Sequence, residues 1–126
     1  MRTIEIPRRE WTHRLDQFSR EREGWPVSLE VCAESIGAQP QFRRLSLAGV
    51  TAEPTGGGTI SITVSVPLGG FLTHTIHSPA HVFMEQDDKG VDASLEVESA
   101  DGTKSILQFT IGRPVCGLVR GRCGLP

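Results

Sequence analysis

The chain has 126 residues, of which 37% are hydrophobic and 22% are charged, and its formal net charge is −2. This length suits one domain with its own core, and the composition lies outside the disordered class. All fifteen acidic residues precede residue 111, so residues 1–110, with ten basic residues, carry a formal charge of −5, which disfavours nucleic acid as a partner.

The N-terminal part predicts a short strand followed by one amphipathic helix. Residues 3–6 alternate between polar and apolar, and Pro7 suits the first position of a helix. From residue 8 to residue 23, Trp11, Leu15 and Phe18 fall at i, i+4 and i+7 and form one narrow apolar stripe. Gly24 follows the last turn as a helix-ending residue. We therefore expect one helix that packs on a sheet through a single seam.

The rest of the chain alternates with the period of β-strands and is divided by Gly- and Pro-rich turns. Gly49 lies where the apolar phase of residues 42–53 flips, which predicts a bulge or a sharp bend. The Asp101-Gly102 pair predicts a hairpin. The expected strands cover residues 27–33, 42–53, 59–66, 71–78, 81–86, 91–98 and 104–110.

Residues 59–66 give the clearest of these strand patterns. Their apolar side chains alternate with an uncharged hydroxyl row that comprises Thr59, Ser61, Thr63 and Ser65. The strand carries no Lys, Pro or bulge signal of the kind that blocks pairing at an edge, so we expect it inside the sheet or paired across a dimer. The hydroxyl row is the first place to look for a covering element or a second subunit.

These elements predict an α+β fold. The turns are too short for crossover helices, so the sheet must be mainly antiparallel. We expect one N-terminal amphipathic helix packed on a strongly bent six- or seven-stranded sheet or a small, partly open barrel. Residues 1–110 form the predicted domain, and residues 111–126 form an atypical tail rich in Gly, Arg and Cys.

Three histidines give the spacing that most resembles a metal site. His74, His77 and His81 form an H-x2-H-x3-H cluster. Metal ligands must converge on one point, whereas His74 and His77 point to opposite faces of a strand. A metal-binding protein or enzyme that uses these imidazoles is therefore an alternative hypothesis. The simpler interpretation is one half-buried imidazole at the core edge and two imidazoles on the solvent side.

No other set of residues predicts catalysis or a cofactor. The chain has no G-x-S-x-G elbow and no Tyr, and the Gly56-Gly57-Gly58 triplet precedes a strand, whereas phosphate loops precede a helix. Trp25 flanks the helix and is expected to pack, although an exposed Trp25 would be an interaction hot spot. We therefore expect no cofactor and lean toward a non-enzymatic protein.

The compartment follows from what the sequence lacks. There is no secretory h-region at the N-terminus and no apolar run of the roughly 20 residues needed to span a bilayer. We expect a cytoplasmic protein with no membrane contact. The odd cysteine count, with Cys32, Cys116 and Cys123, gives no disulfide framework.

Several separated blocks resemble, in order, a family of small bacterial proteins that is catalogued only as a domain of unknown function. The blocks are residues 4–11 (IEIPRREW), 18–19 with 24–25, 49–52, 72–76 and 95–103 (LEVESADGT). The resemblance implies a bacterial, soluble, single-domain protein and supplies no activity. It ends near residue 110, so Cys116 and Cys123 are not expected to be essential.

The sequence therefore favours a small non-enzymatic module that binds a protein partner or itself. The alternatives are the histidine-based metal site or enzyme and an RNA-binding small barrel, which the acidic body disfavours. Thr59, Ser61, Thr63, Ser65 and Trp25 are the predicted binding residues.

Overall fold

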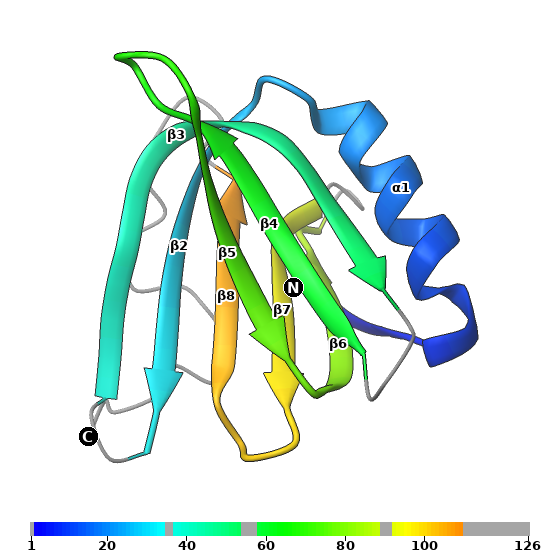
Figure 1. The fold of residues 1–126 in the computed structure, drawn as a ribbon. Coiled ribbons are helices and arrows are strands. Elements are labelled where there is room, and N and C mark those ends of the chain that lie inside the picture. The colour runs from blue at the N-terminus through cyan, green and yellow to red at the C-terminus, as the bar shows by residue number, and fades with distance from the viewer. Residues whose placement is uncertain (1, 35–36, 54–57, 89–91, 110–126) are drawn as a thin grey trace.

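The computed structural model describes residues 2–34, 37–53, 58–88 and 92–109. Its elements are β1 (Arg2–Ile6), the short 3-10 helix η1 (Arg8–Glu10), α1 (Trp11–Arg22), β2 (Pro26–Ala33), β3 (Gly37–Glu53), β4 (Thr59–Ser65), β5 (Phe71–His77), β6 (Pro79–Gln86), β7 (Asp92–Ser99) and β8 (Lys104–Phe109). One α-helix and one sheet confirm the α+β prediction (Figure 1). The predicted tail, residues 111–126, lies outside the described residues.

Within the described ranges the sheet has eight strands in the order β1-β6-β7-β8-β2-β3-β4-β5, and every neighbouring pair is antiparallel. The predicted count of six or seven is corrected to eight, because residues 2–6 also pair, along β6. As far as the chain is described, β1 and β5 do not pair with each other, so the sheet does not close into a barrel and the bent-sheet alternative is the correct one. The outermost of the described strands are β1 and β5.

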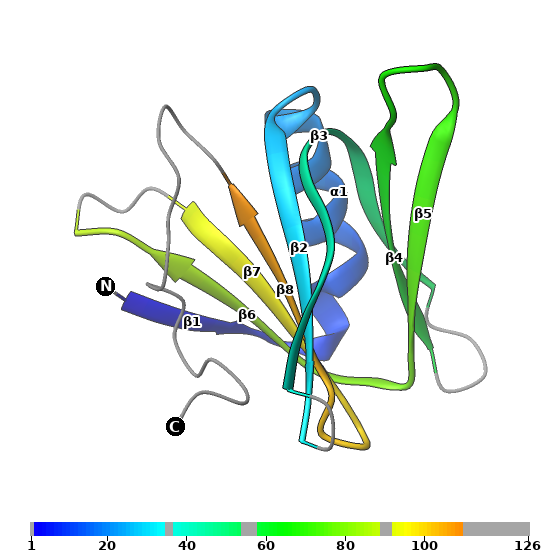
Figure 2. The same ribbon diagram turned by 90° about the vertical axis from the view of Figure 1, so that its left-hand side faces the viewer.

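The sheet bends strongly around the helix. In Figure 2, β1, β6, β7 and β8 fan out on one side of α1, while β4 and β5 lie on its other side. A single residue, Ser78, separates β5 from β6, although these strands belong to opposite sides of the sheet. Ser78 has a positive φ of 52°, which turns the chain sharply at this corner.

The apolar seam of α1 fills the inner face of the bend. Trp11, Leu15 and Phe18 are all buried in the core cluster, as the i, i+4, i+7 spacing predicts. The Trp11 indole N–H donates to the carbonyl oxygen of Ile6 at 2.9 Å, which satisfies its polar edge. Gly24 has a φ of 87° and ends the helical segment, as predicted.

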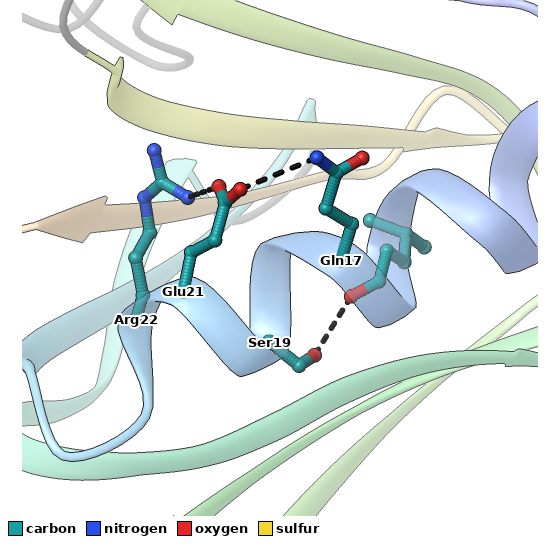
Figure 3. A network of polar contacts seen from close by, with 5 residues as sticks. Gln17, Ser19, Glu21 and Arg22 are labelled. Carbon is teal, nitrogen blue, oxygen red and sulfur yellow. Dashed lines mark hydrogen bonds and ion pairs between the residues drawn. The ribbon is translucent and has the colours of Figure 1, made fainter.

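One hydroxyl joins the helix to the bulge in β3. The β3–β4 register shifts between Leu47 and Gly49, which confirms the bend predicted at Gly49. The Ser19 Oγ accepts a hydrogen bond from the Val50 N–H at 2.7 Å and lies 2.8 Å from the Leu15 carbonyl oxygen, the contact drawn at Ser19 in Figure 3. A backbone N–H exposed by the bulge is thereby paired with a side chain of α1.

Replacing Ser19 with Ala should therefore destabilise the protein. The substitution leaves the partly buried Val50 N–H without this acceptor, which costs about 1–3 kcal/mol of unfolding free energy. Urea denaturation of the two proteins measures the loss. Thr12→Ala, at an exposed position of α1, is the matched control and should change the free energy by less than about 0.5 kcal/mol. Equal effects of the two substitutions would contradict the role given to Ser19.

Candidate functional site

The hydroxyl row lies on the outer face of β4, away from α1. Ile60, Ile62 and Val64 of the same strand are buried in the core, so the alternating Thr and Ser side chains face the other way, where they are half-buried. Because β4 lies between β3 and β5, the prediction that this strand is interior is confirmed. The row continues across β5, where Thr73 Oγ1 lies 3.1 Å from Thr63 Oγ1.

Strand β5 is an edge strand whose free hydrogen-bonding groups can be assigned. In the hairpin that joins β4 to β5, the Val66 N–H donates to the Gly70 carbonyl oxygen at 3.2 Å, and the antiparallel register continues from this pair. Hydrogen-bonded and non-hydrogen-bonded pairs alternate along such a ladder. Alternate β5 residues therefore bond to β4, and the others direct N–H and C=O outward: Phe71, Thr73, Thr75 and His77.

The two outermost strands, β1 and β5, differ in the side chains that line their free edges. The edge strand β1 carries Arg2 and Glu5 and is followed by Pro7, which are residues that discourage further pairing. Strand β5, Phe71–His77, has seven residues with no Lys, Arg, Asp, Glu or Pro, and its register with β4 has no bulge. Its edge therefore lacks the usual protection against a further strand.

The exposed large hydrophobic side chains of the described residues all belong to the β4–β5 hairpin. Leu68 is 102% exposed, Phe71 is 71% exposed and Leu72 is 44% exposed. Figure 1 shows the tip of this hairpin standing beyond the rest of the sheet. Exposed apolar side chains next to a strand edge without charged residues or Pro are typical of a surface that another chain covers. The arrangement can bind a strand through backbone groups and hold it through apolar contacts.

The structure does not bring the three histidines together. His74 and His77 lie on opposite faces of β5, and on β6 His81 Nδ1 lies 2.9 Å from Glu5 Oε2 while its ring stacks on Phe83. In the part of the chain that the structure describes, no three His, Cys, Asp or Glu side chains are placed to hold a metal ion. The geometry therefore gives the metal alternative no support.

Trp25 is half-buried against the core. Its ring meets the Phe109 ring edge-on with centroids 6.5 Å apart, and the Arg22 guanidinium lies 5.5 Å from the Trp25 centroid. The same guanidinium also stands 4.8 Å from the Phe18 centroid. Trp25 thus belongs to an aromatic cluster at the C-terminal end of α1. It lies between α1 and β2, whereas the hydroxyl row lies on β4.

A small cleft of about 130 Å³ runs along α1. Its apolar lining is Ile6, Phe18 and Met84, and its polar lining is Arg14, Gln17, Glu21, Arg22 and Gln86. Glu21 accepts hydrogen bonds from Gln17 at 3.2 Å and from Arg22 at 3.1 Å, the contacts drawn as dashed lines in Figure 3. Arg14 in turn donates to Glu10 at 3.3 Å. Glu21 thus bonds to two of the polar groups that line the cleft, Gln17 and Arg22, and the geometry does not single out a ligand for it.

Sequence reasoning missed the hairpin tip. Leu68, Phe71 and Leu72 are not among the predicted binding residues, although Phe71 and Leu72 begin the strand expected over residues 71–78. A signal was present, because an apolar Leu68 within a Pro-Leu-Gly-Gly turn has no core to enter. This signal points to a binding surface only once β5 is known to be an edge strand, and the strand order in the structure shows that it is.

Comparison with known proteins gives relatives of unknown activity. A family model described as "Family of unknown function (DUF5335)" matches residues 2–114. An uncharacterised protein from Aquifex aeolicus (strain VF5) is 26% identical over 115 residues, which cover 91% of this chain and 98% of the relative. No solved structure gives a significant match. These findings confirm the resemblance to an uncharacterised family.

Among the described residues, no helix has the length and apolar character that crossing a membrane requires.

Half-burial of His74 gives a pH-dependent signature. Loss of hydration lowers the pKa of this imidazole below its ordinary value near 6.5. The folded state therefore favours the neutral ring. As the pH falls from about 6.5 through the lower pKa of the folded state, protonation of His74 favours unfolding and the free energy of unfolding decreases. An NMR titration should place the His74 midpoint below 6.5. In His74→Asn, the loss of stability between about pH 7.5 and about pH 5 should be smaller than in the parent. A His74 midpoint at or above 6.5 would contradict the burial.

Proposed function

Given that this chain belongs to the family of unknown function DUF5335, we propose that it is a small interaction module that takes up an extended strand of another protein chain along β5. The observation that carries the proposal is the coincidence of two features on one hairpin. The edge of β5, which carries no Lys, Arg, Asp or Glu, offers a row of backbone groups that no described strand pairs with, and the exposed hydrophobic side chains Leu68, Phe71 and Leu72 lie beside it.

In strand addition, backbone hydrogen bonds supply affinity and side-chain contacts supply specificity. The outward N–H and C=O groups of β5 hold the incoming strand in register, whatever its sequence. The two faces of β5 determine which side chains the incoming strand can have. Leu72 and Ile76 extend the core-side face, whereas Thr73 and Thr75 extend the hydroxyl face. A strand that alternates aliphatic and hydroxyl side chains matches both faces.

The hairpin tip adds the apolar contribution. Covering a fully exposed Leu or Phe side chain contributes roughly 1.5–3 kcal/mol. Leu68 and Phe71 are largely exposed in the isolated chain, so most of this free energy is available to a partner. The hydroxyl row of β4 lies one strand further in, on the other side of β5 from the incoming strand, and adds no Lys, Arg, Asp or Glu to this face of the sheet.

A blocked heptapeptide of alternating Thr and Val tests strand addition directly. Added in excess to dilute 15N-labelled protein, it should shift the amide resonances of Phe71, Thr73, Thr75 and His77 and slow their exchange with solvent, because these N–H groups gain acceptors. Resonances of the charged edge β1 should stay unchanged. Unchanged resonances and exchange along β5 at millimolar peptide would contradict the proposed function.

Two variants serve as controls for this experiment. Thr75→Pro removes an outward N–H and leaves the β4–β5 ladder intact, so peptide binding should be lost while the melting temperature stays close to that of the parent. Thr75→Lys should weaken binding through charge without altering the backbone. Peptide binding that survived in both variants would show that the site lies elsewhere.

A further inference from the structure

We propose that the strand taken up by β5 is β5 of a second copy of this chain, paired antiparallel about a twofold axis that passes through His74. This inference rests on the proposed function, and it names the partner for the same site. Identical subunits most often associate through such a self-complementary surface.

The direction of the backbone groups restricts how β5 can pair with itself. Only Phe71, Thr73, Thr75 and His77 direct N–H and C=O outward, so residues of this phase must meet residues of the same phase. A twofold antiparallel pairing therefore places its axis at a residue, never between two residues. An axis at His74, the middle of the seven-residue strand, uses every outward group.

The sequence of β5 is nearly symmetric about the same residue. On either side of His74 stands a threonine, Thr73 and Thr75, and beyond these stand the aliphatic residues Leu72 and Ile76. In this pairing, Thr73 lies opposite Thr75 of the partner subunit in a hydrogen-bonded pair. Leu72 lies opposite Ile76 of the partner subunit on the core-side face. Like side chains therefore meet on both faces.

The residues of β5 bring no fixed charge to this pairing. Strand β5 carries no Lys, Arg, Asp or Glu, and the cross-strand neighbour of His74 on β4 is Ile62. His74 lies opposite His74 of the partner subunit, and Leu72 and Ile76 flank it on its own strand. Half-burial lowers the pKa of His74, which keeps both facing rings uncharged near neutral pH. The exposed Phe71 lies opposite His77 of the partner subunit and is covered by the pairing.

Cysteine cross-linking of the full chain tests both the partner and the register. In a background with Cys116→Ser and Cys123→Ser, single variants His74→Cys, Thr73→Cys and Thr75→Cys are compared in a mild thiol–disulfide buffer. At the axis, the two Cα atoms of a non-hydrogen-bonded pair lie about 4.5 Å apart, which suits a disulfide. Two copies of Thr73→Cys or Thr75→Cys are diagonal neighbours about 7–8 Å apart, which is too far.

We expect His74→Cys to form covalent dimer faster than either neighbouring variant by roughly tenfold. Sedimentation equilibrium of the unmodified chain under reducing conditions should show a concentration-dependent dimer. Thr75→Pro should raise its dissociation constant about tenfold or more, because one backbone hydrogen bond is lost at each of two symmetric positions. Sedimentation keeps the test valid if His74→Cys folds poorly.

Three results would overturn the inference: a chain that stays monomeric at all concentrations, preferential cross-linking at position 73 or 75, or a dimer that Thr75→Pro leaves unchanged. These results are distinguishable from failure of the proposed function. A monomeric chain whose β5 amides still respond to the Thr–Val peptide would retain strand addition and lose only the second copy as its partner.

Discussion

An open antiparallel sheet leaves edge strands with outward backbone groups, and in the described part of this chain the two outermost strands, β1 and β5, differ in the side chains that flank those groups. At β1, charged Arg2 and Glu5 and the following Pro7 discourage another strand. At β5 the same backbone groups are flanked by no Lys, Arg, Asp, Glu or Pro. The difference cannot come from the demands of the core, since both strands turn one face inward. It is a property of the outer edge alone.

The open sheet is possible because α1 occupies the inside of the bend. Its seam of Trp11, Leu15 and Phe18 supplies the apolar contact that the curved inner face requires, and Ser19 pairs the N–H of Val50 at the bulge in β3. With the inner face filled by a helix, the sheet needs no second layer or closure to form a core. The β4–β5 hairpin can therefore extend beyond the body without loss of core packing.

Local periodicity predicted most of the fold. The helix seam, the bulge at Gly49 and the α+β class follow from side-chain alternation or spacing, and the interior position of β4 follows from its lack of residues that block pairing at an edge. The alternation predicts no strand between residues 33 and 42, but residues 37–41, which include Pro40, belong to β3. Proline is tolerated there because, among the described residues, that half of β3 pairs only with β2. The predicted hydroxyl row lies beside the bare edge, whereas Leu68 and Phe71 were missed. Their exposure depends on strand order, which periodicity does not encode.

The central claim is that β5 presents an edge which other strands can extend, and amide hydrogen exchange tests it most directly. The exchange rates of Phe71, Thr73, Thr75 and His77 should fall as the concentration of the full chain rises, whereas those of β1 should not change. Thr75→Pro should abolish this dependence. Exchange rates along β5 that are independent of concentration, and also unaffected by an added strand-forming peptide, would contradict the account.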